Sequence, residues 1–224
     1  TQPESSAASD VYKRQDNIDI VFNELDALFN LELNTGKPLK SPTPLTFIRL
    51  GTSGTIQANI ELDSLIVAEA AIGFDCLMHY YEPSMCEHPI AISLHSKLGM
   101  SKNLNHPYYI DGDSVLVDDC LKLGMRKGII VTNPGFYAPQ GRHLRTKNIL
   151  PYDLNEFLHF NYKDSIITNF DMETSGIYGL SHVMGHRAIS ISAILANRFH
   201  STFSNQADKT CLLYTSDAAD DSGC

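Results

Sequence analysis

The sequence lacks several features that would each assign a class of function directly. No apolar run approaches the ~18 residues that a membrane-spanning helix needs. No run of Lys and Arg supplies the clustered positive charge that a nucleic-acid backbone requires, and the formal net charge is −9. The motifs of a serine hydrolase elbow and of a nucleotide P-loop are also missing. We therefore expect neither a membrane nor a nucleic acid as a partner.

Cysteine is sparse and unpatterned. Outside the closing segment the chain has an odd number of cysteines, without Cys-x-x-Cys spacing: Cys76, Cys86 and Cys120. Such cysteines are typical of free thiols in a reducing compartment, so we predict a cytoplasmic protein with packing roles for Cys76 and Cys120.

The nine histidines give no convincing metal motif. His182 and His186 are four residues apart, but Gly185 interrupts the predicted helix and no carboxylate follows in register. We predict that the chain has no metal site.

The two ends of the chain differ from its middle. Residues 1–15 and 211–224 resemble translated sequencing-adapter tails, and the chain has no initiator Met. We predict that both ends are non-native or disordered, which would leave the natural chain cut at both ends. The stretch 16–210 is long enough for one domain with a sizeable core.

Apolar patterning in 16–210 alternates between helical and strand character. It predicts helices at 16–30, 114–123, 153–159 and 173–184, and strands at 45–50, 65–72, 128–132, 166–169 and 188–195. Residues 33–44 are rich in proline and read as a loop, and 78–111 show no period and read as irregular. The alternation indicates an α/β domain with a largely parallel or mixed sheet, whose ligands bind at the carboxyl ends of strands.

The first motif, Arg49-Leu50-Gly51-Thr52-Ser53-Gly54, ends the strand predicted at 45–50 with a glycine-rich loop. Its glycines let backbone N–H groups approach an anion, and the hydroxyls of Thr52 and Ser53 add donors. The planar fork of Arg49 can hold two phosphate oxygens. Taken alone, the segment is equally compatible with a glycine-rich turn beside a surface arginine.

The second motif is Phe136-Tyr137-Ala138-Pro139-Gln140-Gly141-Arg142. Phe136 offers a ring on which a base can stack, and the amide of Gln140 has the donor and the acceptor that complement a uracil edge. Arg142 can stabilise negative charge on the uracil oxygens. The alternative is a polar loop whose amide and guanidinium are solvated.

Two shorter motifs complete the set. Met172-Glu173 lies where a predicted strand ends and a helix begins, so the carboxylate could accept hydrogen bonds from two adjacent sugar hydroxyls or simply cap the helix. Asn197-Arg198 ends the last predicted strand.

In order and spacing, the four motifs resemble the uridine phosphorylase branch of the nucleoside phosphorylase family over most of 16–205. The resemblance implies a three-layer α/β phosphorylase fold, with a central mixed β-sheet flanked by helices and its N-terminal part missing. It implies reversible phosphorolysis of a pyrimidine nucleoside, with inorganic phosphate as co-substrate and no other cofactor, in a homo-hexamer or dimer. A purine nucleoside phosphorylase, a hydrolytic nucleosidase of the same fold and a non-catalytic nucleoside-binding protein are the alternatives.

The resemblance also implies a role for each motif residue. Phosphate would be bound by Arg49, Gly51 and Thr52; the base by Phe136, Gln140, Arg142 and Arg198; and the ribose by Thr52, Met172 and Glu173. Arg49, Thr52, Arg142 and Glu173 would carry the catalysis. The family commonly has Glu where this chain has Asp171, so a contact from 171 stays open. Asn197 stands where purine-specific relatives place an acidic Asp, which favours a pyrimidine.

Overall fold

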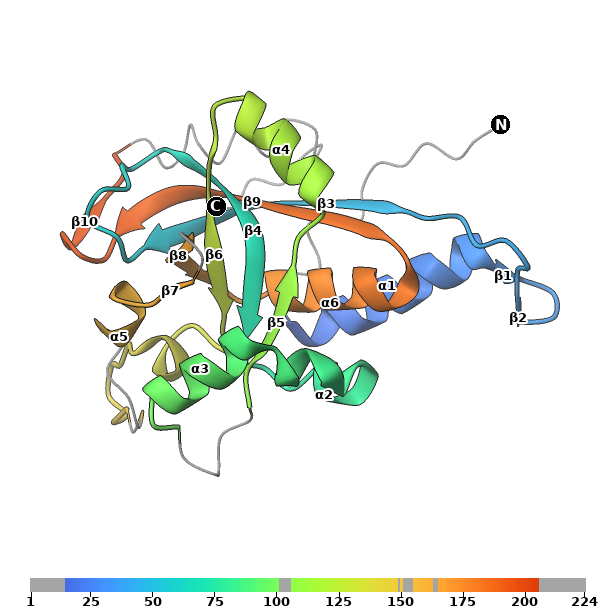
Figure 1. Cartoon of the computed structure of the whole chain (residues 1–224), viewed down its shortest axis with the longest axis horizontal. Coiled ribbons are helices and arrows are strands. Elements are labelled where there is room, and N and C mark those ends of the chain that lie inside the picture. Colours follow the sequence, from blue (N-terminus) through green and yellow to red (C-terminus); the bar gives the residue numbers. More distant parts are fainter. Residues whose placement is uncertain (1–14, 101–105, 149, 151–154, 163–164, 206–224) are drawn as a thin grey trace.

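Eight strands form a mixed β-sheet with helices on both of its faces, and two short strands pair separately (Figure 1). The computed structural model describes residues 15–100, 106–148, 150, 155–162 and 165–205. The predicted α/β class, with a central mixed sheet flanked by helices, is confirmed. The tails predicted at 1–15 and 211–224 lie outside the described residues, apart from Gln15 at the start of the first helix.

The helices and strands have the following bounds. The α-helices are α1 (Gln15–Asn30), α2 (Met78–Tyr81), α3 (Pro89–Lys97), α4 (Ser114–Lys122), α5 (Asn155–Leu158) and α6 (Thr174–Met184), with short 3-10 helices η1 (Pro83–Glu87) and η2 (Ala138–Gln140). The strands are β1 (Leu31–Glu32), β2 (Lys37–Pro38), β3 (Thr46–Thr55), β4 (Leu65–Gly73), β5 (Tyr108–Asp111), β6 (Arg126–Thr132), β7 (Asn161–Tyr162), β8 (Ser165–Asp171), β9 (Arg187–Asn197) and β10 (Thr202–Phe203).

The sheet bends back on itself because β9 pairs with β4 as well as with β3 and β10. The sheet order is β10-β9-β3-β8-β6-β4-β5, with parallel pairing of β3 with β9, β6 with β8, and β4 with β6. The strand β9 also pairs antiparallel with β4, through Ile191 to Ala193. The ring β9-β3-β8-β6-β4 therefore closes, and it brings the carboxyl ends of β3, β6 and β8 to one region of the molecule.

Adjacent residues of β9 show how the two faces are covered. Ala188 packs among side chains of α6 and α1, including Tyr178 and Phe22. Its neighbour Ile189 faces the other way and packs under α4, against Val117. Because successive strand residues point to opposite faces, a strand buried on both faces reads as a continuous apolar run, which is why 188–195 was predictable.

The predicted helix at 16–30 is confirmed as α1, although only part of its apolar stripe is buried. Ile18 and Phe22 are buried against α6 and the sheet, and the Phe22 ring stacks on Phe47 with centroids 4.1 Å apart. Leu28 and Phe29, at the far end of the same stripe, are exposed. Of the helix predicted at 153–159, residues 153 and 154 lie outside the described residues and the remainder contains α5.

The prediction that 78–111 is irregular is wrong. This stretch contains α2, η1, α3 and β5, and β5 pairs antiparallel with β4. The side chain of His88 caps α3 by accepting the N–H of Ile90, and Pro89 starts the helix. Elements of four to nine residues are too short to show a helical period, so the local capping signal was the informative one.

No helix among the described residues has both the length and the apolar character that crossing a bilayer demands.

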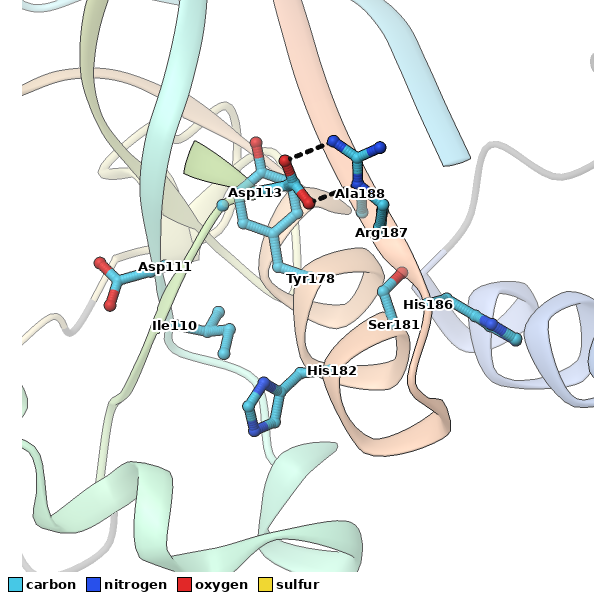
Figure 2. Close-up of a pocket in the computed structure, with 10 residues that line it drawn as sticks. Ile110, Asp111, Asp113, Tyr178, Ser181, His182, His186, Arg187 and Ala188 are labelled. Atoms are coloured by element: carbon cyan, nitrogen blue, oxygen red, sulfur yellow. Dashed lines mark hydrogen bonds and ion pairs between the residues drawn. The ribbon is translucent and has the colours of Figure 1, made fainter. Parts of the chain in front are cut away.

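An ion pair at the start of α4 should contribute to the free energy of unfolding in a way that is lost at low pH. Arg187 donates two hydrogen bonds to Asp113, from Nε at 2.7 Å and from Nη2 at 2.9 Å (Figure 2). These bonds from Arg187 lower the pKa of Asp113 from 3.8 to about 2. A lowered pKa in the folded state gives stability that is present above the unfolded pKa and is lost as pH falls toward 2.

We therefore expect the free energy of unfolding of Asp113→Asn to fall less between pH 4 and pH 2 than that of the parent chain, as measured by urea denaturation. Asparagine keeps the cap that Asp113 gives to the N–H of Leu116. The exposed Asp118 of the same helix is the matched control. Equal acid slopes for Asp113→Asn, Asp118→Asn and the parent chain would contradict the prediction.

Candidate functional site

The loop predicted at Gly51–Gly54 is instead the second half of β3. Residues from Thr46 to Thr55 pair with β9 without interruption up to a register shift between Ser53 and Gly54. Their backbone groups therefore enter the sheet ladder, and the prediction of a free glycine-rich anion loop is wrong. Arg49 accordingly lies in the middle of a strand rather than at its end.

Gly51 is explained by the side chain two residues before it. A Cβ added at Gly51 would lie 2.7 to 2.8 Å from Nη1, Cζ and Nη2 of Arg49. The guanidinium thus lies directly over the Gly51 backbone, and glycine in a strand often marks such a close approach. Because Gly51 has no side chain, it leaves room for the Arg49 guanidinium and so determines where this positive charge lies.

Strand alternation separates Thr52 from Arg49. Arg49 and Gly51 share the partly buried face of β3, whereas Ile48, Leu50 and Thr52 are exposed. Because successive strand residues point to opposite faces, Thr52 lies on the face away from the guanidinium. The structure does not bring Arg49 and Thr52 together.

Arg49 and Glu173 meet across 124 residues of sequence. Nη2 of Arg49 donates to Oε2 of Glu173 at 2.7 Å and lies 3.5 Å from Oδ2 of Asp171. The three side chains are only 14%, 18% and 1% exposed, respectively. Burial raises the pKa of Glu173, Arg49 opposes that shift, and the neighbouring charge of Asp171 adds to it. One cation therefore faces two carboxylates in a poorly solvated place.

The residues around this cluster were missed from sequence, apart from Asp171, whose contacts were left open. Nη1 of Arg49 donates to Oγ of Ser190 at 3.3 Å, and Thr174 bonds to both Ser190 and Asp171. A signal was present in β9, where Ser190 and Ser192 interrupt an apolar run at every second position. Alternating serines in a buried strand indicate a polar patch on one face.

Phe136, Gln140 and Arg142 form a second cluster. The guanidinium carbon of Arg142 lies 3.9 Å from the centroid of the Phe136 ring, and Nη1 donates to the Phe136 carbonyl at 2.9 Å. The same Nη1 donates to Oε1 of Gln140 at 2.5 Å. Gln140 is 3% exposed and Phe136 is 50% exposed, so the cluster has a buried polar end and an accessible aromatic ring.

Arg198 braces this cluster, as the resemblance implied for the base motif. Its Nη2 donates to the backbone carbonyl of Gln140 at 2.8 Å, and its guanidinium lies over the Phe170 ring at 5.3 Å. Burial, together with the like charge of Arg142, lowers the pKa of Arg198 to about 10. Among the described residues no carboxylate forms a salt bridge with either arginine, and two such cations side by side are suited to binding negative charge.

The two clusters are joined through β3 and β8. Gly54 pairs with Phe170, and Ser53 donates its hydroxyl to the Phe170 carbonyl at 2.6 Å. Phe170 lies under Arg198 and is followed directly by Asp171. Met172, which is half-buried, lies between Asp171 and Glu173 in sequence. The anion-binding, sugar-binding and base-binding candidates therefore converge on one region, except for Thr52.

Asn197 has a structural role next to this region. Its Nδ2 donates to the carbonyls of Gln57 and Ile60, and its Oδ1 accepts the N–H of His200. The side chain is 3% exposed and its amide group is fully used. Asn197 therefore offers no proton to a base.

The two candidate metal ligands point apart. Gly185 ends α6 with a φ of 75°, so His186 is not one helical turn after His182, and Figure 2 shows their rings directed away from each other. Nδ1 of His186 accepts the N–H of Leu45, and Nε2 lies 3.1 Å from Oδ1 of Asp26. Within the part of the chain that the structure describes, no group of three or more His, Cys, Asp or Glu could hold a metal ion.

Both histidines line a cavity of about 300 Å³ that is separate from the two clusters (Figure 2). Its charged lining includes the Asp113–Arg187 ion pair. None of the motif residues lines it.

Comparisons with known proteins agree with the resemblance that the motifs carry. A family model described as the Phosphorylase superfamily matches residues 30–216. The chain is 30% identical over 175 residues to a uridine phosphorylase of Thermococcus kodakarensis, covering 77% of this chain and 56% of that protein. It is 24% identical over 167 residues to a uridine phosphorylase of Haemophilus influenzae, covering 72% and 58%. The chain thus spans less than two thirds of these curated relatives.

Solved structures show the same fold. A nucleoside phosphorylase of Trypanosoma brucei, described as showing uridine phosphorylase activity, aligns with a TM-score of 0.75 at 23% identity, over 92% of this chain and 77% of that one. A uridine phosphorylase of Schistosoma mansoni aligns with a TM-score of 0.55 at 20% identity, over 89% and 64%.

Proposed function

We propose that this chain, which belongs to the phosphorylase superfamily, carries the active site for reversible phosphorolysis of a pyrimidine nucleoside, converting uridine and phosphate to uracil and ribose 1-phosphate. The observation that carries the proposal is the cluster of Phe136, Gln140 and Arg142, braced by Arg198. It combines a stacking ring, an amide and two cations, which fits a planar base that leaves as an anion. The position of Asn197, whose amide is fully used, supports a pyrimidine because a purine leaving group calls for an acid there.

The chemistry follows from where charge develops. As the glycosidic bond lengthens, its electron pair moves to the base nitrogen and the ribosyl carbon becomes cation-like. Phosphate held at Arg49 attacks that carbon, while Gln140 and Arg142 stabilise the departing uracil anion. Glu173 and Met172 orient the ribose. Positioning and electrostatic stabilisation thus provide the rate enhancement.

Gly51 acts in this proposal by making room for Arg49, and Thr52 is left out because it faces away. Phosphate is the co-substrate and no other cofactor is invoked. We propose a homo-oligomer in the cytoplasm, with the complete gene product as the active species.

The test is base release from uridine and from inosine, each with and without phosphate, by the full-length gene product that contains this sequence. Uracil release that requires phosphate is the expected result. Cleavage of inosine in preference to uridine would indicate a purine enzyme, and cleavage without phosphate would indicate a hydrolytic nucleosidase. Uridine binding without turnover would indicate a non-catalytic binding protein.

We expect Gly51→Ala to raise the KM for phosphate by about 10-fold or more, because the new methyl group displaces the Arg49 guanidinium. The unfolding midpoint should also fall, because the displaced guanidinium pairs with the poorly solvated carboxylates of Glu173 and Asp171, but by less than when the guanidinium is removed. Gly54→Ala is the control, because its Cβ would meet Ala196 at an ordinary 3.5 Å. Equal phosphate KM values for the two variants would refute this role of Gly51.

A further inference from the structure

Asp171 is a buried carboxylate for which the proposed reaction has no use. Its side chain is 1% exposed, and it lies behind Arg49 with Oδ2 3.5 Å from Nη2. At 1% exposure the carboxylate is closed to a nucleoside or a phosphate ion that approaches from solvent. Burying a carboxylate costs several kcal/mol unless a cation and hydrogen bonds compensate, so its surroundings show what it does.

Asp171 is fixed by donors on both of its oxygens. The hydroxyl of Thr132 donates to Oδ1 at 2.6 Å. The backbone N–H of Thr174 donates to Oδ2 at 3.1 Å, and the Thr174 hydroxyl donates to the same oxygen. Thr174 is the first residue of α6, so the carboxylate also lies at the positive end of the helix dipole. These contacts hold the carboxylate in one orientation.

A second anchor reaches Arg49 through Ser190. Oγ of Ser190 accepts from Nη1 of Arg49 at 3.3 Å and lies 2.8 Å from Oγ1 of Thr174. Asp171, Thr174 and Ser190 therefore form one connected support behind the guanidinium. The support belongs to the sheet and to the start of α6, and it does not include Glu173.

Glu173 is the anchor that the reaction must release. It accepts from Nη2 of Arg49 at 2.7 Å. In the proposed reaction the same carboxylate accepts the ribose hydroxyls, which competes with its bond to Arg49. An arginine that loses its strongest anchor regains rotamer freedom, at a cost to any ligand that needs it fixed.

We propose that Asp171 is a positioning residue. Together with Ser190, it keeps the Arg49 guanidinium directed at phosphate when Glu173 breaks its hydrogen bond to Arg49 and binds the ribose hydroxyls. The inference rests on the proposed function and deepens it. It gives the two carboxylates different roles: Glu173 binds the ribose, and Asp171 positions Arg49.

The experiment measures Asp171→Asn and Ser190→Ala in the full-length gene product. With uridine saturating, we expect Asp171→Asn to raise the KM for phosphate by about 10- to 100-fold, as misplaced reacting groups do. Ser190→Ala, which loses one hydrogen bond to a charged group, should raise it by about 3- to 10-fold. The Kd of uridine measured by calorimetry without phosphate should stay within about twofold, because the cluster at Phe136 to Arg142 is unchanged.

Ser181→Ala is the matched control. Ser181 is a buried serine of α6, 2% exposed, and its hydroxyl has no hydrogen-bond partner among the described residues. It should leave both constants unchanged. A parent protein that releases no uracil with phosphate present defeats the proposed function itself. A parent protein that is active, with an unchanged phosphate KM in Ser190→Ala and in a folded Asp171→Asn, overturns the positioning role alone. If thermal melting shows that Asp171→Asn does not fold, Ser190→Ala decides.

Discussion

We expect Arg49→Leu to abolish the proposed phosphorolysis and to lower the free energy of unfolding by about 3 to 5 kcal/mol, the usual cost of removing one partner from a buried ion pair. Two carboxylates share this one arginine, Glu173 at 2.7 Å and Asp171 at 3.5 Å. Without the cation they repel each other in a place that water hardly reaches. Urea denaturation monitored by circular dichroism measures the loss of stability.

The loss of stability should depend on pH in a defined direction. Arg49 lowers the pKa of Glu173, whereas burial and Asp171 raise it, so removing Arg49 raises it further. A carboxyl group whose folded pKa exceeds its unfolded value stabilises the fold at low pH and loses that contribution as pH rises. The deficit of Arg49→Leu should therefore be smaller near pH 5 than near pH 8.

Two further variants make this result specific. Glu173→Gln in the Arg49→Leu background removes one of the repelling charges and should restore part of the stability. Lys122→Leu breaks an ion pair of similar length, 2.8 Å, with Asp119, but the two side chains are 75% and 58% exposed. Exposed pairs contribute little to the free energy of unfolding, so this control should change it little. A deficit as small in Arg49→Leu as in Lys122→Leu would show that the cluster is solvated.

Most of the longer strands and helices could be predicted from sequence because their apolar patterns are long enough to read. The run at 188–195 became β9, and the periodic stretches at 16–30 and 173–184 became α1 and α6. The segment 78–111 could not be predicted, because its short helices and β5 are set by caps and by pairing with β4. Contacts made far along the chain do not appear in a local period.

The local structure of the first motif differs from the prediction. The absence of a side chain at Gly51 leaves space for the Arg49 guanidinium, whereas the sequence predicted a loop that presents N–H groups. Thr52 was grouped with Arg49 by spacing, although the uninterrupted pairing of β3 with β9 places it on the other face. Whether a glycine-rich segment turns or continues as a strand depends on the partner strand, which a linear motif does not contain.

Arg142→Ala should lower kcat for uridine by about 10²- to 10³-fold, the cost of losing one donor that stabilises charge developing in the transition state. Arg142 lies over the Phe136 ring, donates to the side chain of Gln140 and lies close enough to Arg198 to lower its pKa. Its charge is therefore available to a departing base anion, since no salt bridge to a carboxylate neutralises it among the described residues. The KM for phosphate should change far less, because Arg49 and its supports are untouched.

Two comparisons show whether the lost charge is responsible for this effect. Arg145→Ala removes an exposed arginine from the same loop and should leave kcat within about twofold, as surface substitutions usually do. A nucleoside with a more acidic base needs less help to leave, so a 5-fluorinated uridine should lose less of its rate than uridine in Arg142→Ala. If Arg142→Ala slowed both nucleosides equally, Arg142 would act in binding the base rather than in stabilising the leaving anion. That result would leave the fold and the phosphate site unchanged but would move the catalytic role from the arginine to the remaining members of the cluster, Gln140 and Arg198.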